Sequence, residues 1–153
     1  MGKRLWISVG VLAAILLVAG LSINRAYGQL VDVTPPTIVS VSVTPEVLWP
    51  PNHKMKTVTV SAVVTDDTDL APTWTILSVA SNEPVTGPGD VTSPDWVITS
   101  PTTVQLRAER LGTGTGRIYT ITIQASDISG NTATATVNVT VPHDKGKHKG
   151  KNK

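Results

Sequence analysis

The amino-acid sequence predicts an all-β fold, a sandwich of about seven antiparallel strands, and three observations support this prediction. Apolar and polar residues alternate with a period of two through most of the chain after residue 29, as in strands with one buried and one solvated face. Val, Ile and Thr are abundant, and their branching at Cβ suits a pleated surface. Turn signals recur roughly every 8–15 residues, and no segment after residue 29 has the pattern of an amphipathic helix.

The first 28 residues have the three-part pattern of a secretory signal peptide. Lys3 and Arg4 precede an apolar run from Leu5 to Leu21, and Ala26-Tyr27-Gly28 resembles a small-x-small cleavage site before Gln29. An uncleaved N-terminal anchor is the alternative, because the run approaches the length that spans a bilayer. Both interpretations predict an exported protein, secreted or at the cell surface, which contacts the membrane only if this segment is retained.

The domain is expected over residues 29–144 and begins with an extended segment, Asp32–Pro36, that two prolines stiffen. Its best-defined part is the hairpin Arg117–Val141, in which two alternating halves flank the turn Asp127–Asn131. Proline- and glycine-rich loops and an acidic turn separate the other strands. In chain order, the expected strands are Thr37–Thr44, Met55–Val64, Pro72–Ala80, Trp96–Thr99, Thr103–Glu109 and the two halves of the hairpin.

Seven strands in this order fit a sandwich of immunoglobulin type, and that topology predicts which loops lie together. One end should hold Asp32, the turn Asp66–Asp69 and the turn Asp127–Asn131. The opposite end should hold the loops Trp49–Lys54 and Glu83–Asp95. Any function of such a domain is therefore expected in the loops at its two ends.

The formal net charge of +2 averages three unlike segments. Residues 29–144 hold five basic residues and all eleven acidic ones, a net charge of −6, so the expected domain is acidic. The remaining basic residues lie in the first 28 residues and in residues 145–153, which contain five lysines. We expect this tail to be disordered and to contact anionic surfaces, and we expect no specific nucleic-acid binding. The chain has no cysteine, so the core alone must stabilise the domain.

Several segments resemble the bacterial immunoglobulin-like modules that are related to hyalin repeats. They are DVTPPTI from Asp32, LWPPNHK from Leu48, SNEP from Ser81, LRAERLGTGTGRIYTIT from Leu106, and the ending SGNTATATV of the hairpin. The resemblance covers about Asp32–Asp144, and LWPPNHK is its most specific motif. It implies an extracellular β-sandwich module, usually part of a larger multidomain protein, and no known catalytic activity. Hyalin-type repeats commonly carry a cysteine pair, which this chain lacks, so no disulfide is expected from the resemblance.

The first end of the sandwich contains candidate calcium ligands. Calcium takes six to eight oxygen ligands, often from carboxylates on flexible loops. Adjacent carboxylates without a cation repel one another and raise one another's pKa values. The alternative is turn chemistry, in which Asp and Asn side chains bond to nearby backbone groups, and the spacing fits no EF-hand loop. The candidate ligands are Asp66, Asp67, Asp69, Asp127 and the side-chain carbonyl of Asn131, with Asp32 nearby.

Three interpretations are open for the opposite end. One is a zinc or mixed metal site, for which the available side chains are His53, Glu83, Asp90, Asp95, Glu109 and His143. Another is a structural network in which Arg107 or Arg110 pairs with Glu83 or Asp95 while Trp49 and Trp96 pack beneath the loops. The third is a groove in which Trp49 and Trp96 bind a sugar or a peptide, since amphipathic rings also mark binding surfaces.

The sequence also predicts roles for two aromatic residues, and it lacks the common enzyme motifs. Trp74 is expected to pack in the core, and the hydroxyl of Tyr119 is expected to bond to nearby backbone as a tyrosine corner. The sequence has no phosphate-binding loop, no HExxH motif, no cysteine nucleophile and no recognisable Ser-His-Asp triad, so we expect no enzyme. We expect a non-enzymatic exported bacterial module for adhesion, interaction or structural spacing at the cell surface, stabilised by calcium, whose partner is a surface protein or a glycan. The alternative is a carbohydrate- or peptide-binding module.

Overall fold

The computed structural model describes residues 31–86 and 92–144. The predicted signal peptide or anchor at residues 1–28, the lysine-rich tail at residues 145–153, and Asp90 lie outside the described residues. Contacts divide the chain into two units, Met1–Leu30 and Val31–Lys153, and all strands belong to the second. Within the described ranges, no helix has the length and apolar character that crossing a membrane requires.

Seven strands form the fold, and each lies within a residue or two of an expected strand. They are β1 (Thr37–Thr44), β2 (Met55–Thr65), β3 (Thr73–Ser81), β4 (Trp96–Ser100), β5 (Thr103–Arg107), β6 (Gly116–Ser126) and β7 (Thr132–Pro142).

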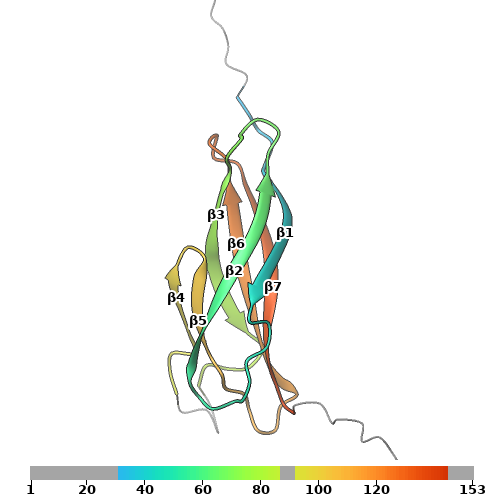
Figure 1. The fold of residues 1–153 in the computed structure, drawn as a ribbon. Helices are drawn as coiled ribbons and strands as arrows, with labels where there is room; N and C mark the ends of the chain where they lie inside the picture. The colour runs from blue at the N-terminus through green and yellow to red at the C-terminus, as the bar shows by residue number, and fades with distance from the viewer. Residues whose placement is uncertain (1–30, 87–91, 145–153) are drawn as a thin grey trace, which may run out of the picture. The chain divides into compact units, whose positions relative to one another are not determined.

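The seven strands form two antiparallel sheets, with the order β1-β2-β5-β4 in one and β3-β6-β7 in the other (Figure 1). This is the arrangement of the seven-stranded immunoglobulin sandwich, in which the first, second, fifth and fourth strands form one sheet. The predicted fold class is therefore confirmed. The β2–β3 and β6–β7 turns lie at one end, and the β5–β6 connection lies at the other (Figure 1).

Alternation along the strands builds the core. In β6, Tyr119, Ile121, Ile123 and Ala125 are fully buried, while the residues between them are half-buried. These side chains pack against the inner residues of the other sheet, such as Val58 and Leu106. Trp74 is half-buried and packs against this cluster, as expected. The buried set also includes Val43, Leu48, Val60, Ile76, Val79, Val104, Val139 and Val141.

The segment after β1 leaves its own sheet and joins the other one. Val47 forms a parallel bridge with Thr140 of β7. The N–H of Leu48 donates to the Thr140 carbonyl at 2.8 Å, and the N–H of Thr140 donates to the Glu46 carbonyl at 2.9 Å. The first part of the chain therefore contacts both sheets: β1 pairs with β2, and residues 46–48 pair with the end of β7.

The fifth strand ends at Arg107, two residues before the predicted end at Glu109. The regular pairing ends here because Ala108 bonds to two successive residues before β2, and the chain then turns, with the Glu109 N–H donating to the Arg107 carbonyl at 2.9 Å. The Ala108 N–H donates to the Lys54 carbonyl, and the Ala108 carbonyl accepts from the His53 N–H, each at 2.9 Å. Ala108 and Glu109 remain buried in this turn, which explains why their burial resembles that of strand residues.

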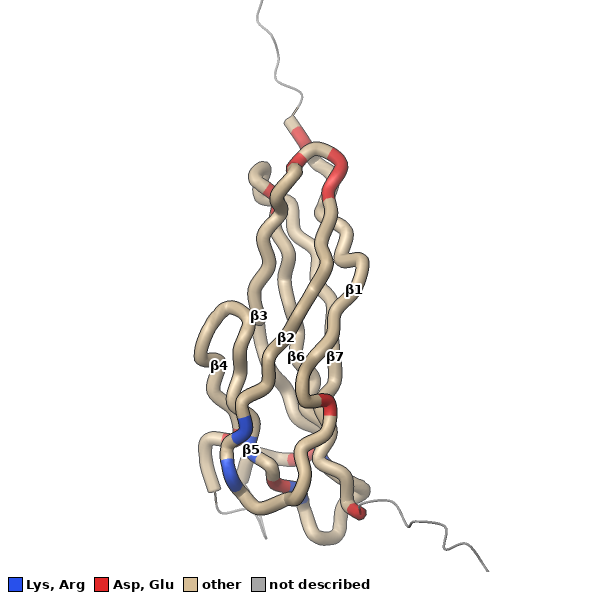
Figure 2. Tube along the Cα trace, in the orientation of Figure 1, with Lys and Arg blue, Asp and Glu red and all other residues tan. Residues whose placement is uncertain are grey.

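Charged residues lie at the two ends of the sandwich (Figure 2). The strands themselves contain only three charged residues, Lys56, Arg107 and Arg117. We call the end that holds Asp32, Asp66–Asp69 and Asp127–Asn131 the aspartate end. The faces between the two ends carry uncharged side chains, mostly of Thr, Ser and Val.

Candidate functional site

The aspartate end brings together three carboxylates from three separate segments. Asp32 precedes β1, Asp66 follows β2, and Asp127 follows β6. One carboxylate oxygen of each lies within 4.8 Å of the corresponding oxygens of the other two. Two of the predicted ligands, Asp66 and Asp127, therefore meet, and Asp32 joins them. We call these three residues the aspartate cluster.

Two oxygens of the cluster are buried and have no hydrogen-bond partner. The Oδ1 atom of Asp66 accepts from the N–H groups of Thr68 and Asp69, at 3.0 and 2.8 Å. The Oδ1 atom of Asp32 accepts from the Thr34 N–H at 2.9 Å. These bonds are the expected turn chemistry, but they occupy only one oxygen of each carboxylate. The Oδ2 atoms of Asp32 and Asp66 are buried with no partner.

Asp127 is held by Asn131. Its Oδ1 accepts from the Asn131 N–H and its Oδ2 from the Asn131 Nδ2, each at 2.8 Å. Burial acts to raise the pKa of Asp127, but the hydrogen bonds from the Asn131 side chain and from the backbone of residues 129–131 outweigh it and lower this pKa. Asp127 therefore stays a carboxylate. The Asn131 Nδ2 also donates to the Asp32 carbonyl at 3.1 Å, which fastens the segment before β1.

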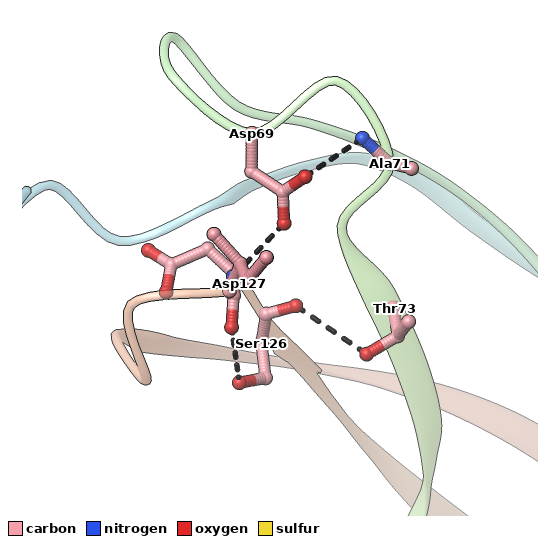
Figure 3. Close-up of a pocket in the computed structure, with 6 residues that line it drawn as sticks. Asp69, Ala71, Thr73, Ser126 and Asp127 are labelled. Atoms are coloured by element: carbon pink, nitrogen blue, oxygen red, sulfur yellow. Dashed lines mark hydrogen bonds between the residues drawn. The ribbon is translucent and has the colours of Figure 1, made fainter.

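Asp69 joins the two turns of the aspartate end (Figure 3). Its Oδ1 accepts from the Ala71 N–H and its Oδ2 from the Ile128 N–H, each at 2.9 Å. Together with Ser126 and Asp127 it lines a small open pocket between the turns. Because both of its oxygens already accept backbone hydrogen bonds, Asp69 has the role of a structural link.

The two remaining predicted calcium ligands, Asp67 and Asn131, do not belong to the aspartate cluster. Asp67 is exposed, and its Oδ1 accepts from the Thr68 hydroxyl at 3.1 Å. Asn131 presents its amide nitrogen, not its carbonyl oxygen, to both Asp127 and Asp32. It therefore positions cluster residues, whereas the sequence pattern indicated it as a direct ligand.

The aspartate cluster offers ligands of the kind that a hard cation such as calcium could use. All of its donors are oxygens, and hard cations such as calcium prefer oxygen to nitrogen or sulfur. A divalent cation beside the buried Oδ2 atoms of Asp32 and Asp66 would supply their missing partner and offset the repulsion among three carboxylates. The cluster would hold the cation with Asp32, Asp66 and Asp127, and backbone carbonyls or water would complete the coordination.

The opposite end is built around a buried arginine. Arg117, at the start of β6, is 0% exposed. Its Nε donates to Glu83 Oε2 at 3.2 Å, its Nη2 donates to the Pro84 carbonyl at 3.2 Å, and its Nη1 contacts Asp95 Oδ2. Glu83 and Asp95 are themselves 7% and 1% exposed. The sequence predicts a network here, but with Arg107 or Arg110 as the paired arginine.

Arg107 and Tyr119 extend this network. The Nε atom of Arg107 lies 3.8 Å from Asp95 Oδ1, so the predicted pairing of this arginine with an acid is confirmed. The Tyr119 hydroxyl donates to the Arg107 carbonyl at 2.8 Å, which confirms the predicted tyrosine corner. Trp96 packs edge-to-face on Tyr119, with ring centroids 6.2 Å apart. We call Glu83, Asp95, Arg107, Arg117 and Tyr119 the arginine network.

The described side chains among those suggested for zinc do not form one site. His53 Nδ1 lies 2.6 Å from Glu109 Oε2, which the Thr92 hydroxyl also contacts. His143 lies apart from them, bonded to the Gly112 carbonyl at 3.0 Å. Across the described ranges, only the aspartate cluster places three metal-binding side chains close enough to share an ion.

The two tryptophans suggested as a ligand platform lie in different surroundings. Trp96 contacts Tyr119 and the core. Trp49 is 37% exposed and lines a small open pocket with Leu48 and Lys56. No ring contact joins these two described tryptophans.

No family model, curated protein or solved structure matches this chain.

Proposed function

We propose that residues 29–144 form a non-enzymatic exported module that serves adhesion, interaction or structural spacing at a bacterial cell surface. In this proposal the module binds calcium at its aspartate end. The observation that carries the proposal is the convergence of three carboxylates within 4.8 Å, two of which have a buried oxygen without a partner. The signal-like N-terminal segment and the resemblance to hyalin-type modules support the extracytoplasmic location.

The geometry favours calcium over the other common cations. The described cluster offers no nitrogen or sulfur, which zinc usually requires. Magnesium demands a nearly ideal octahedron, whereas calcium accepts irregular loop-borne oxygens. Because few oxygens are uncommitted, we expect weak binding, with a dissociation constant of about 0.1–1 mM, the range of extracellular modules.

Calcium at this position would fasten the segment before β1 to the sandwich. Asp32 belongs to that segment, whereas Asp66 and Asp127 belong to the two turns. Without the ion, the direct bond from the sandwich to Asp32 is the one from Asn131 to its carbonyl. The ion therefore holds the Asp32 segment against the two turns.

Thermal unfolding of residues 29–153 with calcium or EDTA tests this proposal. Calcium at 10 mM, about ten times a dissociation constant of 1 mM, should stabilise by about 1.4 kcal/mol and raise the Tm by about 5 °C. Asp66→Asn should abolish this increase and slightly raise the Tm in EDTA, because it removes like-charge repulsion while its amide oxygen still accepts the turn hydrogen bonds.

Asp67→Asn is the matched control, because it removes the same charge from the neighbouring exposed position outside the cluster. It should preserve the response to calcium. An unchanged Tm in calcium for the unsubstituted chain, or an equal response in the Asp66→Asn variant, would rule out the aspartate cluster as a calcium site.

A second candidate function is carbohydrate or peptide binding, and the exposure of Trp49 in its pocket favours it. Trp96 contributes less to this proposal, because its ring packs on Tyr119. A glycan array with the unsubstituted chain and Trp49→Ala tests the idea. Binding that survives this substitution would exclude the Trp49 pocket as the binding site.

A further inference from the structure

The edges of the two sheets differ in how they are protected. The edge strands are β1 and β4 in one sheet and β3 and β7 in the other. Three of them carry a one-residue bulge, at Val39 in β1, at Leu77 in β3 and at Thr99 in β4. A bulge disrupts the regular row of backbone groups and so prevents another strand from pairing with the edge.

The fourth edge strand, β7, has no such irregularity. It pairs with β6 in unbroken register from Gly116↔Pro142 to Ser126↔Thr132. It contains no charged residue, and its only proline is the last residue, Pro142. Bulges, charged side chains and internal prolines, which commonly protect an edge, are therefore absent from this strand.

Part of this edge is already covered by the segment after β1. Residues 46 and 48 bond to the N–H and the carbonyl of Thr140, on the side of β7 that faces away from β6. Backbone groups alternate sides along a strand, so those of Thr132, Thr134, Thr136 and Asn138 face the same way as those of Thr140. No backbone hydrogen bond to the N–H or carbonyl groups of these four residues from outside the sheet is found among the described residues.

The inner side chains along the same stretch are incompletely covered. Ala133, Ala135 and Val137 point inward by alternation, yet each is only half-buried, whereas Val139 and Val141 are fully buried. The fully buried pair flanks Thr140, where residues 46–48 lie against the edge. β1 also contacts β7, but it forms no backbone hydrogen bond with Thr132–Asn138 among the described residues. This stretch therefore combines outward-facing backbone groups with incompletely buried apolar side chains.

We propose that the β7 edge of a second copy of this chain pairs with Thr132–Asn138 in antiparallel register, centred on Ala135. This pairing sets Thr134 opposite the partner's Thr136 and Thr132 opposite the partner's Asn138. It engages all four free outward-facing residues of each copy in about eight backbone hydrogen bonds. The two sheets join into one six-stranded sheet around a two-fold axis.

A second copy fits this edge because the strand is compatible with itself. Antiparallel pairing about Ala135 brings no charges face to face, since β7 has none. It places threonines opposite threonines on the outer face, a favourable cross-strand pair. On the inner face, Ala135 meets its own counterpart, and their small side chains allow close approach.

The pairing is expected to be weak. One strand from each copy contributes, so the contact falls below the size of stable interfaces, and the dissociation constant should be about 0.1–1 mM. Such affinity becomes significant when many copies are held close together on a surface. The inference does not depend on calcium, since the pairing uses neither Asp32 nor the turns.

Sedimentation equilibrium of residues 29–153, run to about 1 mM protein, tests the association. We expect reversible dimers for the unsubstituted chain, in calcium and in EDTA alike. Thr134→Lys with Thr136→Lys places like charges opposite each other across the pair and should weaken the dimer at least tenfold. The control is Thr120→Lys with Thr122→Lys, which adds the same charge on the outer face of the central strand β6 and should leave association nearly unchanged.

Cross-linking tests the register independently of affinity. The chain has no cysteine, so Ala135→Cys introduces a single thiol. In the proposed register the two Cα atoms at position 135 are about 4.5 Å apart, within disulfide range. Mild oxidation should give a disulfide-linked dimer quickly, whereas Ala133→Cys, which faces the partner's Val137, should react at least tenfold more slowly.

Three results would overturn the proposal. They are a monomer throughout the concentration range, equal weakening by the edge lysines and the central-strand lysines, and equal cross-linking at positions 133 and 135. Circular dichroism melts of each variant confirm that the compared proteins are folded.

Discussion

Arg117 is the residue on which the end opposite the aspartates depends. A fully buried guanidinium requires partners for its charge, and Glu83, Asp95 and the Pro84 carbonyl supply them. These partners lie at the two described ends of the connection between β3 and β4, so one side chain holds both ends against the sandwich. This network is an internal structural element, since its central groups are inaccessible to solvent.

Replacement of Arg117 should be strongly destabilising. Arg117→Met removes the buried guanidinium that Glu83 and Asp95 share, and only Asp95 keeps a second arginine, Arg107, nearby, so it should cost about 3–5 kcal/mol of unfolding free energy. Arg110→Met is the control, because that arginine is half-buried and bonds only to backbone carbonyls among the described residues. Urea unfolding followed by tryptophan fluorescence measures both. Equal losses would show that Arg117 is no more important than a partly exposed arginine.

Tyr119 provides a spectroscopic measure of the same network. Burial raises the pKa of Tyr119 to about 12, although the neighbouring Arg117 acts to lower it. Because this pKa exceeds the unfolded value of about 10, the folded state keeps the proton longer, and stability should fall as the pH rises from about 10 to 12.

Absorbance at about 295 nm measures this ionisation directly, because Tyr119 is the only tyrosine after residue 28. We expect a midpoint near pH 12 in the folded protein and near pH 10 in concentrated guanidinium. A folded-state midpoint near 10 would mean that the hydroxyl is solvated, contrary to the buried tyrosine corner.

At the scale of elements, β7 should show two alternating rates of amide hydrogen exchange. The odd-numbered residues bond to β6 and should be protected, whereas the N–H groups of Thr134, Thr136 and Asn138 face outward and should exchange quickly in dilute monomer. Thr140 should be protected despite its even number, since its N–H bonds to Glu46. NMR-detected exchange at low concentration checks this, and uniform protection along the strand would contradict the open edge.

The strands could be predicted from the sequence, but their irregularities could not. Alternation over β6 and β7 identifies both strands nearly to the residue, because one buried face imposes a period of two. The bulge at Val39 appears in the sequence only as two adjacent apolar residues, Ile38 and Val39. The bulge at Leu77 likewise follows an apolar neighbour. When two apolar residues are adjacent, the sequence does not show which of them has no partner residue in the neighbouring strand.

At the scale of the whole molecule, the topology allowed the loops to be assigned to the correct ends. Asp66 and Asp127 meet because the second and sixth strands of this fold end on the same side. Which of the acidic residues keep an oxygen available for a cation depends on individual hydrogen bonds, and the sequence pattern does not predict these bonds. Asp69 is occupied by backbone N–H groups of two turns, while Asp32 keeps one oxygen without a partner.

The contacts of Arg117 could not be predicted from the sequence either. This arginine stands at the start of a strand, where the sequence predicted no role for it, yet Glu83 and Asp95 are buried beside it and make it the centre of the network. Glu83 and Asp95 lie 34 and 22 residues before Arg117 in the sequence. Their contact follows from the path of the β3–β4 connection, which the composition of that loop does not specify.

The parallel bridge between residues 46–48 and β7 has a mechanical consequence. The described chain begins at one end of the sandwich and finishes at the other (Figure 1). Tension between the two ends would pull the parallel segments 46–48 and β7 in opposite directions along their axes. The hydrogen bonds at Thr140 lie across that direction, so they would have to break together in shear instead of opening one by one. A module that spaces other domains from a surface would resist stretching through these few bonds.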